Sequence, residues 1–449
     1  MPALLFLALS LPAAELPAGV GQFRGADQSG VAEGEAPLEW GPGRNILWQI
    51  PNPGEGWSQP VVSGDRLFLT SAVMKTPPPE GSAGVAYGGG SANRDRRDVS
   101  QAEYRWEVRC LDANTGETLW TRVVREGRPE LKRHSTNTYA TETPVTDGTY
   151  VAAYFGMHGL YGFTVEGEPV WRKDLDARPM ANDWGTASSP ALHDGNILLQ
   201  VDNEAQSYLA AFDLATGEER WRTDRDSVSQ YGSPYVWRNS KRDEVVCVGQ
   251  FVISYDPADG KELWRIDLNR GRSSATPVAD GDTLYVGNEL RNRGGRDDGG
   301  GYRFGVRAGG SGDITPPGVR GEGPLTNEHI AWGVEEAGVA MASPVLAGGH
   351  LYVLERRVGA LRCYDAATGE RAYIKRMPGS GAFWASPVAA AGRVYCLDDE
   401  GTTHVLKAGP QFELLASNDL PQVTWATPAV ADGRFYLRGA DTLYCIGEK

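Results

Sequence analysis

The stretch from Phe383 to Cys396 reads Phe-Trp-Ala-Ser-Pro-Val-Ala-Ala-Ala-Gly-Arg-Val-Tyr-Cys. An apolar run, a turn at Gly392 and a second apolar run predict two short antiparallel strands lying side by side. The pattern recurs along the chain as a small polar residue, a proline, an aliphatic residue, a glycine turn and an aliphatic–aromatic pair. The prolines that mark it are Pro60, Pro144, Pro190, Pro234, Pro277, Pro344, Pro387 and Pro428.

Five of the seven spacings between these prolines are 41 to 46 residues, and the other two, 84 and 67, leave room for an insertion. A fixed period of this length, made of short strands, is typical of a β-propeller blade. The sequence therefore predicts an all-β fold, an eight-bladed β-propeller of four-stranded antiparallel blades. We name the strands of each blade A to D, from the central channel outward.

A second repeat follows strand C. The segment Leu111-Asp-Ala-Asn-Thr-Gly-Glu-Thr-Leu-Trp120 has counterparts at 212–221, 255–264 and 364–373, the last ending in Tyr instead of Trp. An Asp followed by Gly four residues later predicts a tight turn. The closing Trp then falls on strand D, where a large ring can cover the gap to the next blade.

These repeats resemble the quinoprotein-like, or PQQ-repeat, family of eight-bladed propellers, whose tryptophan-docking motif is Ala-x-Asp-x-x-Thr-Gly-x-x-x-Trp. The resemblance extends from Phe23 to the end of the chain. The family that it indicates includes exported bacterial BamB-like proteins. It implies the fold more strongly than an activity, because the family contains both enzymes and scaffolds.

The two ends of the chain hold complementary halves of one blade. Asn45 to Trp48 resembles a strand D without its own strands A to C, and Leu443 to Ile446 resembles a strand C with no strand D after it. We expect the ring to close by pairing the N-terminal strand with the C-terminal blade, which removes an exposed edge. The predicted organisation is a signal peptide at 1–14, an N-terminal extension at 15–44 and a single propeller at 45–449.

Composition limits the partners. The 58 acidic residues outnumber the 44 basic ones, giving a net charge of −14, which disfavours nucleic acid. The apolar run from Ala3 to Ala14 is too short to span a bilayer and ends in small residues, as a signal peptide does. We therefore expect export to the periplasm or the extracellular space, no membrane span and a monomer.

Successive strands of a blade run in opposite directions, so their connections alternate between the two faces of the ring. The B–C loops and the crossings from strand D to the next strand A therefore lie on one face. The insertions predicted at about 72–104 and 289–328 lie largely or partly on this face, which we call the loop-rich face. Function on a rigid scaffold concentrates in such loops. We expect the protein partner or small ligand to bind on the loop-rich face.

The chain offers candidate residues for several kinds of chemical site. The dehydrogenases of this family hold calcium with Glu, Asn and Asp and carry a disulfide between adjacent cysteines, whereas no two of the five cysteines here are adjacent. Asp183 and Trp184 come nearest to a metal ligand and a stacking group. Acid–base candidates on or near the loop-rich face are Glu142, Glu204, His134 and His158. No histidine pair has metal-ligand spacing.

The residues three before each proline should line the mouth of the channel, where four aromatic side chains would offer a stacking platform or inner core. With two neighbours, the candidate ligand contacts are Trp57, Trp184, Tyr231, Phe383, Trp384 and Trp425. We expect no catalytic residue, no metal and no cofactor, and a non-catalytic exported scaffold that binds a protein partner or small ligand. The alternative is an oxidoreductase that keeps PQQ with calcium in an altered quinone site.

Overall fold

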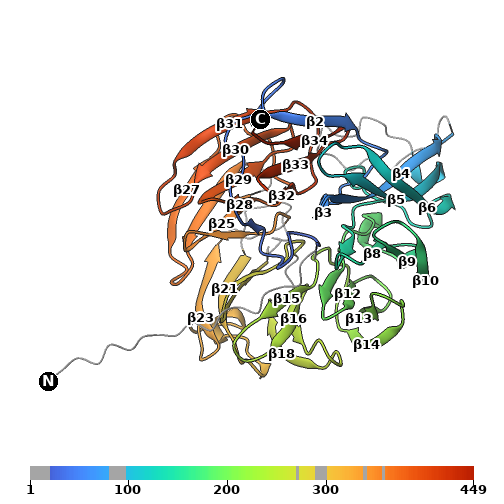
Figure 1. The fold of residues 1–449 in the computed structure, drawn as a ribbon. Helices are drawn as coiled ribbons and strands as arrows, with labels where there is room; N and C mark the ends of the chain where they lie inside the picture. Colours follow the sequence, from blue (N-terminus) through green and yellow to red (C-terminus); the bar gives the residue numbers. More distant parts are fainter. Residues whose placement is uncertain are drawn as a thin grey trace.

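The computed structural model describes residues 21–79, 98–268, 273–288, 301–336, 341–355 and 359–448. Eight sheets surround a central channel, and an N-terminal segment lies at the centre (Figure 1). The predicted eight-bladed, all-β propeller is confirmed.

Each blade contributes four antiparallel strands in the order A to D. Blades one and two contain β3 (Val61–Ser63), β4 (Arg66–Thr76), β5 (Glu103–Asp112), β6 (Thr118–Gly127), β7 (Val145–Thr146), β8 (Tyr150–Phe155), β9 (Gly159–Thr164) and β10 (Pro169–Asp174). Blades three and four contain β11 (Ala191–His193), β12 (Asn196–Val201), β13 (Ser207–Asp213), β14 (Glu219–Arg225), β15 (Tyr235–Arg238), β16 (Asp243–Val248), β17 (Phe251–Tyr255) and β18 (Glu262–Asp267).

The second half of the ring follows the same order. Blades five and six contain β19 (Val278–Asp280), β20 (Thr283–Gly287), β21 (Gly301–Arg307), β23 (Ile330–Glu336), β24 (Val345–Ala347), β25 (His350–Glu355), β26 (Ala360–Asp365) and β27 (Arg371–Arg376). Blades seven and eight contain β28 (Val388–Ala390), β29 (Arg393–Leu397), β30 (Thr402–Lys407), β31 (Leu414–Asp419), β32 (Ala429–Ala431), β33 (Arg434–Arg438), β34 (Thr442–Ile446) and, as strand D of blade eight, β2 (Ile46–Pro51).

Ring closure occurs as predicted. Strand β2 pairs antiparallel with β34, from Ile46 opposite Ile446 to Pro51 opposite Thr442. Two short parallel strands were not foreseen, β1 (Val31–Ala32) beside β28 and β22 (Gly312–Asp313) beside β18. The 3₁₀ turns are η1 (Val99–Gln101), η2 (Ala181–Asp183) and η3 (Pro317–Val319).

The docking tryptophans join neighbouring blades. The Trp120 indole N–H donates to the Val165 carbonyl of the next blade at 3.0 Å, and a Cβ built on Gly167 would lie 2.6 Å from its ring. Trp48 does the same across the ring closure, bonding the Ala113 carbonyl at 3.0 Å and covering Gly116. The turn glycine is thus required both for its positive φ and for the flat ring against it.

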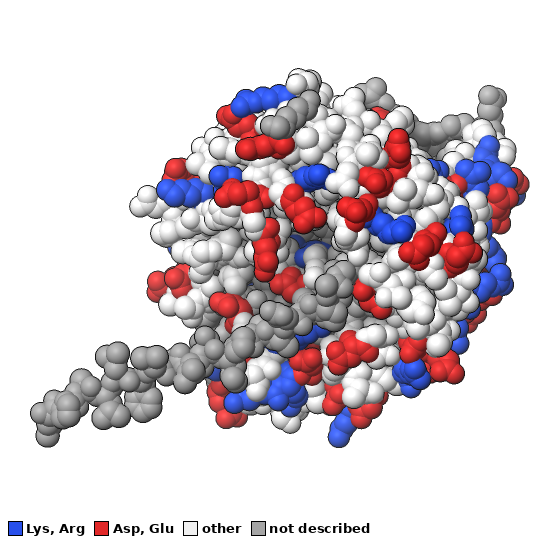
Figure 2. All heavy atoms as spheres, in the orientation of Figure 1, with Lys and Arg blue, Asp and Glu red and all other residues white. Residues whose placement is uncertain are grey.

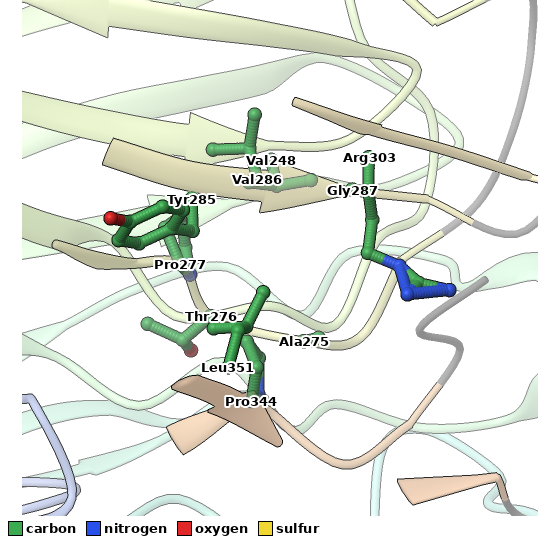
Figure 3. Close-up of a pocket in the computed structure, with 10 residues that line it drawn as sticks. All are labelled: Val248, Ala275, Thr276, Pro277, Tyr285, Val286, Gly287, Arg303, Pro344 and Leu351. Atoms are coloured by element: carbon green, nitrogen blue, oxygen red, sulfur yellow. The ribbon is translucent and has the colours of Figure 1, made fainter. Parts of the chain in front are cut away.

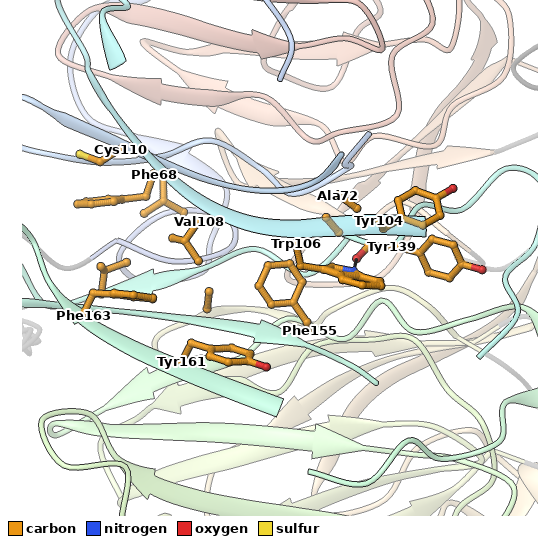
Figure 4. Packing of buried hydrophobic residues seen from close by; sticks show 14 of the residues in the cluster. Phe68, Ala72, Tyr104, Trp106, Val108, Cys110, Tyr139, Phe155, Tyr161 and Phe163 are labelled. Atoms are coloured by element: carbon orange, nitrogen blue, oxygen red, sulfur yellow. Dashed lines mark hydrogen bonds between the residues drawn. The ribbon is translucent and has the colours of Figure 1, made fainter. Parts of the chain in front are cut away.

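The core consists of apolar clusters between blades. Figure 4 shows the cluster of blades one and two, where Trp106, Phe155 and Phe163 pack between the sheets. Trp106 is fully buried, and its N–H donates to the Tyr139 carbonyl at 3.0 Å. Buried aromatic area of this kind stabilises the contact between blades.

Residues Gly21–Ala32, which we call the N-terminal plug, bond to the inner strands. Gly21 pairs with Thr146, the Gln22 side chain accepts from the Leu192 N–H at 2.8 Å, and Gln28 bonds both Pro234 and Val236. The plug therefore satisfies inner-edge backbone groups that would otherwise lack partners.

Arg24 holds the plug to blade six. Its guanidinium is 1% exposed and donates to the carbonyls of Ser29, Ser343 and Pro344. Burial lowers the pKa of Arg24 to about 10, so the side chain stays charged at neutral pH. Between the plug and blades one, seven and eight is a cavity of about 140 Å³.

Candidate functional site

A ring of hydroxyl groups lies where strand A begins. The side-chain oxygen of the residue before each proline accepts a hydrogen bond from the equivalent backbone N–H of the preceding blade, at 2.9–3.3 Å. The accepting residues are Thr143, Ser189, Ser233, Thr276, Ser343, Ser386 and Thr427. These bonds connect adjacent blades around the channel and fix the positions of the residues just before them.

The eighth position of this ring holds Gln59 instead of a hydroxyl residue. Its carboxamide oxygen accepts from the backbone N–H of Arg24 at 2.5 Å, and its carboxamide nitrogen donates to the Pro428 carbonyl at 2.7 Å. The plug and Gln59 thus complete the ring at the junction of blades eight and one.

Three predicted ligand residues form one stack, which we call the tryptophan stack. The rings of Trp384 and Trp425 lie 4.4 Å apart at 14°, and those of Trp425 and Trp57 lie 5.7 Å apart at 28°. Trp425 is 9% exposed, while the outer two are partly exposed. The stack spans blades seven, eight and one at the channel mouth.

Of the other three predicted residues, two contact each other and the third is buried in the core. Trp184 and Tyr231 contact each other, with ring centroids 6.1 Å apart, and both are partly exposed. Phe383 is fully buried in the core of blades six and seven and contacts His404. It has no surface to offer a ligand, because successive residues of an extended chain point to opposite sides.

Two neighbouring carboxylates, which the sequence did not predict, lie beside the stack. Asp399 accepts from the Ala382 N–H at 2.7 Å, two residues before Trp384 in the chain. Asp398 is fully buried and accepts from three backbone N–H groups. Burial, together with the neighbouring Asp398 charge, raises the pKa of Asp399. The only sequence signal was the Asp-Asp-Glu run that follows β29.

The four acid–base candidates are not gathered into one site by the hydrogen bonds and ion pairs of the described residues. Glu204 accepts from the Ser229 N–H, and His134 bonds Thr136. His158 packs edge-on against Trp106 with ring centroids 4.3 Å apart, and burial lowers its pKa to about 4. These contacts are local, and none of them joins two of the four candidates.

Glu142 is a buried acid at the channel. It is 2% exposed, and its Oε1 has no hydrogen-bond partner within the part of the chain that the structure describes. Burial raises its pKa above 4.5, although bonds from Thr186 and nearby backbone groups oppose this. Stability should therefore fall as the pH rises above about 4.5, since the unfolded chain loses this proton first.

We predict that Glu142→Gln raises the free energy of unfolding by about 1–3 kcal/mol at pH 8, because the amide removes a buried charge. Denaturant unfolding at a series of pH values measures this. The advantage of the variant should shrink as the pH approaches 4.5. A variant no more stable than the parent at pH 8 would contradict the assignment.

The thiols lie inside the blades. All five cysteines are buried and unbridged. Burial raises the pKa of Cys110, Cys363 and Cys445 to about 11 and that of Cys247 to about 12, and it raises that of Cys396 as well.

We predict that none of these thiols reacts quickly in the folded protein, because thiolate is scarce and access is blocked. Titration with a chromogenic disulfide should count five thiols after denaturation. Fast labelling of the native protein would contradict this prediction.

The calcium and quinone ligands that the family resemblance implies have no assigned counterparts in this chain beyond Asp183 and Trp184. Within the described ranges, no group of three His, Cys, Asp or Glu side chains could hold a metal ion. Asp183 has a positive φ of 56° and is exposed. No described helix is long and apolar enough to cross a membrane.

A second cavity lies between the inner strands of blades four, five and six. Its volume is about 10 Å³, and Val248, Tyr285 and Arg303 are among the residues that line it (Figure 3). It has room for about one water molecule. It is a packing defect rather than a ligand site.

Known proteins resemble this chain in sequence and in fold. The family model described as outer membrane protein assembly factor BamB matches residues 105–250 and 248–296. BamB of Burkholderia pseudomallei (strain K96243) is 25% identical over 297 residues, which are 61% of this chain and 71% of that protein.

Solved structures share the fold. BamB from Moraxella catarrhalis superposes with a TM-score of 0.58 at 12% identity, over 90% of this chain and 97% of that one. A europium-containing methanol dehydrogenase gives 0.56 at 11% identity, over 97% and 99%. The fold therefore accommodates both an assembly factor and an enzyme. The chain is an eight-bladed β-propeller whose sequence resembles the BamB family model over residues 105–296 and BamB of Burkholderia pseudomallei over 297 residues.

Proposed function

We propose that this protein is a non-catalytic scaffold, exported from the cytoplasm, that binds a protein partner on its loop-rich face. The observation that carries the proposal is the tryptophan stack at the channel mouth. Stacked aromatic side chains with partly exposed outer rings are typical centres of protein interfaces.

The shape of the surface favours a protein over a small ligand. The two described cavities measure about 140 and 10 Å³, below the 300–1,000 Å³ or so of drug-sized pockets. The larger one lies against the plug, not at the tryptophan stack. A protein that binds over the mouth fits these volumes better than a small ligand held within one of the two cavities.

Two further features support the proposal. Basic and acidic side chains are interspersed over the face seen in Figure 2, without the continuous basic surface that nucleic acid requires. The relatives named as assembly factors suggest a role in assembling other proteins.

Photo-cross-linking in the native host tests the proposal. A photoreactive amino acid replaces Glu400 or Asp441, which are exposed in the B–C loops of blades seven and eight. As controls, it replaces Val170 or Ile374, which are exposed on outer strands. We expect a discrete adduct with one protein from the loop positions alone. Adducts only from the outer strands, or none from either loop, would contradict it.

A further inference from the structure

The inner strand of each blade turns backbone groups towards the channel. Strand A pairs only with strand B, so the N–H of its second residue has no partner inside the blade. The N-terminal plug accepts this N–H in blades two, three, four and seven, from Thr146, Leu192, Val236 and Ala389. The plug thus replaces a missing strand at four of the eight blades.

Two of the remaining positions lie at the cavity of about 140 Å³, which we call the channel cavity. They are Val62 in blade one and Val430 in blade eight, and both line the cavity and are partly exposed. Their register in the hairpin is that of Ala389, whose N–H donates to the Gly30 carbonyl at 2.9 Å. No described residue accepts from the N–H of Val62 or Val430. The cavity is therefore bordered by two backbone donors that the described chain leaves unused.

A buried cation borders the same cavity. Arg24 and Gly30 both line it, and a Cβ built on Gly30 would lie 2.8 Å from the guanidinium carbon of Arg24. The Nη1 atom of Arg24 carries two N–H groups, and its one contact among the described residues is with the Ser343 carbonyl at 3.5 Å. The guanidinium therefore keeps a donor for a further acceptor.

The charge of Arg24 is not neutralised by direct contact with a carboxylate. The acceptors that the described residues offer it are all backbone carbonyls. Asp27 favours the charged form of Arg24, but Asp27 is exposed and its Oδ1 accepts from Ser29. Arg225, which is also fully buried, is by contrast paired with Asp202 at 2.8 Å. A buried cation without such a partner is costly, and an anion in the cavity would offset this cost.

The other walls limit the kind of anion. Val61, Val388 and Ala429 are buried aliphatic residues that line the cavity. Its volume is below that of a drug-sized pocket, yet an engineered cavity of about 150 Å³ in another protein holds benzene. One cation and aliphatic walls suit a single negative charge on a short hydrocarbon chain better than a phosphate, which carries about two charges.

We propose that the channel cavity binds a small aliphatic monocarboxylate of about four or five carbon atoms. Its carboxylate accepts from the Arg24 guanidinium and from the backbone N–H groups of Val62 and Val430, and its hydrocarbon chain lies against the valines. This site is distinct from the tryptophan stack, so the inference does not depend on the partner proposed for the loop-rich face.

Isothermal titration calorimetry of the full chain with butyrate tests the site. Butyramide has the same shape without the charge, and butylammonium has the opposite charge. We expect butyrate to bind in a saturable manner, at least about tenfold more tightly than either comparison compound. Equal binding of butyramide, or no binding of butyrate, would overturn the proposal.

A pair of matched variants locates the binding. Ala431 ends β32 and lines the cavity, whereas Ala347 has the same place in β24 and does not line it. Both are partly exposed. Ala431→Leu should weaken butyrate binding by about tenfold or more because it fills the cavity, and Ala347→Leu should leave it unchanged. Equal affinities in the two variants would contradict the location.

A second pair tests the role of the charge. Arg24→Gln should remove the preference for butyrate over butyramide. Because Arg24 also holds the plug, the control is Gln28→Ala, which releases the plug from blade four at a residue that does not line the cavity. We expect this control to keep the preference. A preference that survives in Arg24→Gln, or that is lost equally in Gln28→Ala, would contradict the assignment to Arg24.

Discussion

Removing residues 1–51 should abolish the stable monomer. The deletion takes away β2, which is the outer strand of blade eight, and leaves the β34 edge unpaired. It also removes Trp48 from beneath the turn at Gly116, and emptying a buried Trp site alone costs about 3–5 kcal/mol. With the plug lost as well, the total approaches the roughly 5–15 kcal/mol by which a domain is stable.

Light scattering after size exclusion, together with thermal unfolding, measures this effect. The matched control begins at Gly21 and keeps every contact described above, so it should unfold like the full chain. If the chain lacking residues 1–51 were an equally stable monomer, the closure of the ring through β2 would be wrong.

Trp425→Ala should lower the free energy of unfolding by about 3–5 kcal/mol, since Trp425 fills the centre of the stack between two other rings. Trp384→Ala should cost less, because Trp384 is partly exposed and has one stacked neighbour. Trp425→Phe is the control that keeps a ring at this position and removes the unpartnered N–H.

Urea unfolding of the three variants gives the comparison. The expected order of stability is Trp425→Phe and Trp384→Ala above Trp425→Ala. Equal, small losses for all three would contradict the prediction that the stack stabilises the ring.

The repeat made most of the fold predictable. The prolines before each strand A set the number of blades, and the half-blades at 45–48 and 443–446 predicted the closure that β2 and β34 make. The docking motif predicted tryptophans between blades, as Trp120 shows, because turn and ring recur at fixed spacing. Periodic features of this kind can be recognised in a single sequence.

The plug was not predictable in the same way. Gln22, Arg24 and Gln28 bond backbone groups of several blades that are far away in the sequence. Single polar side chains carry no periodic signal. Strands β1 and β22 have two residues each, too few to show alternation.

The position of the tryptophan stack could be predicted from the repeat. The offset of three residues before the proline correctly grouped Trp57, Trp384 and Trp425, since the hydroxyl ring fixes this position in every blade. Phe383, which precedes Trp384, is buried in the core instead, because side-chain direction alternates along an extended chain. Asp399 lies in a B–C loop, and its hydrogen bond with Ala382, two residues before Trp384, forms only in the folded chain.

The central claim is that this propeller serves binding rather than quinone chemistry. Reconstitution with PQQ and calcium, followed by absorbance and by dye-linked alcohol oxidation, tests it directly. The account predicts no stoichiometric uptake of PQQ and no turnover. Stoichiometric binding with sustained alcohol oxidation would contradict it.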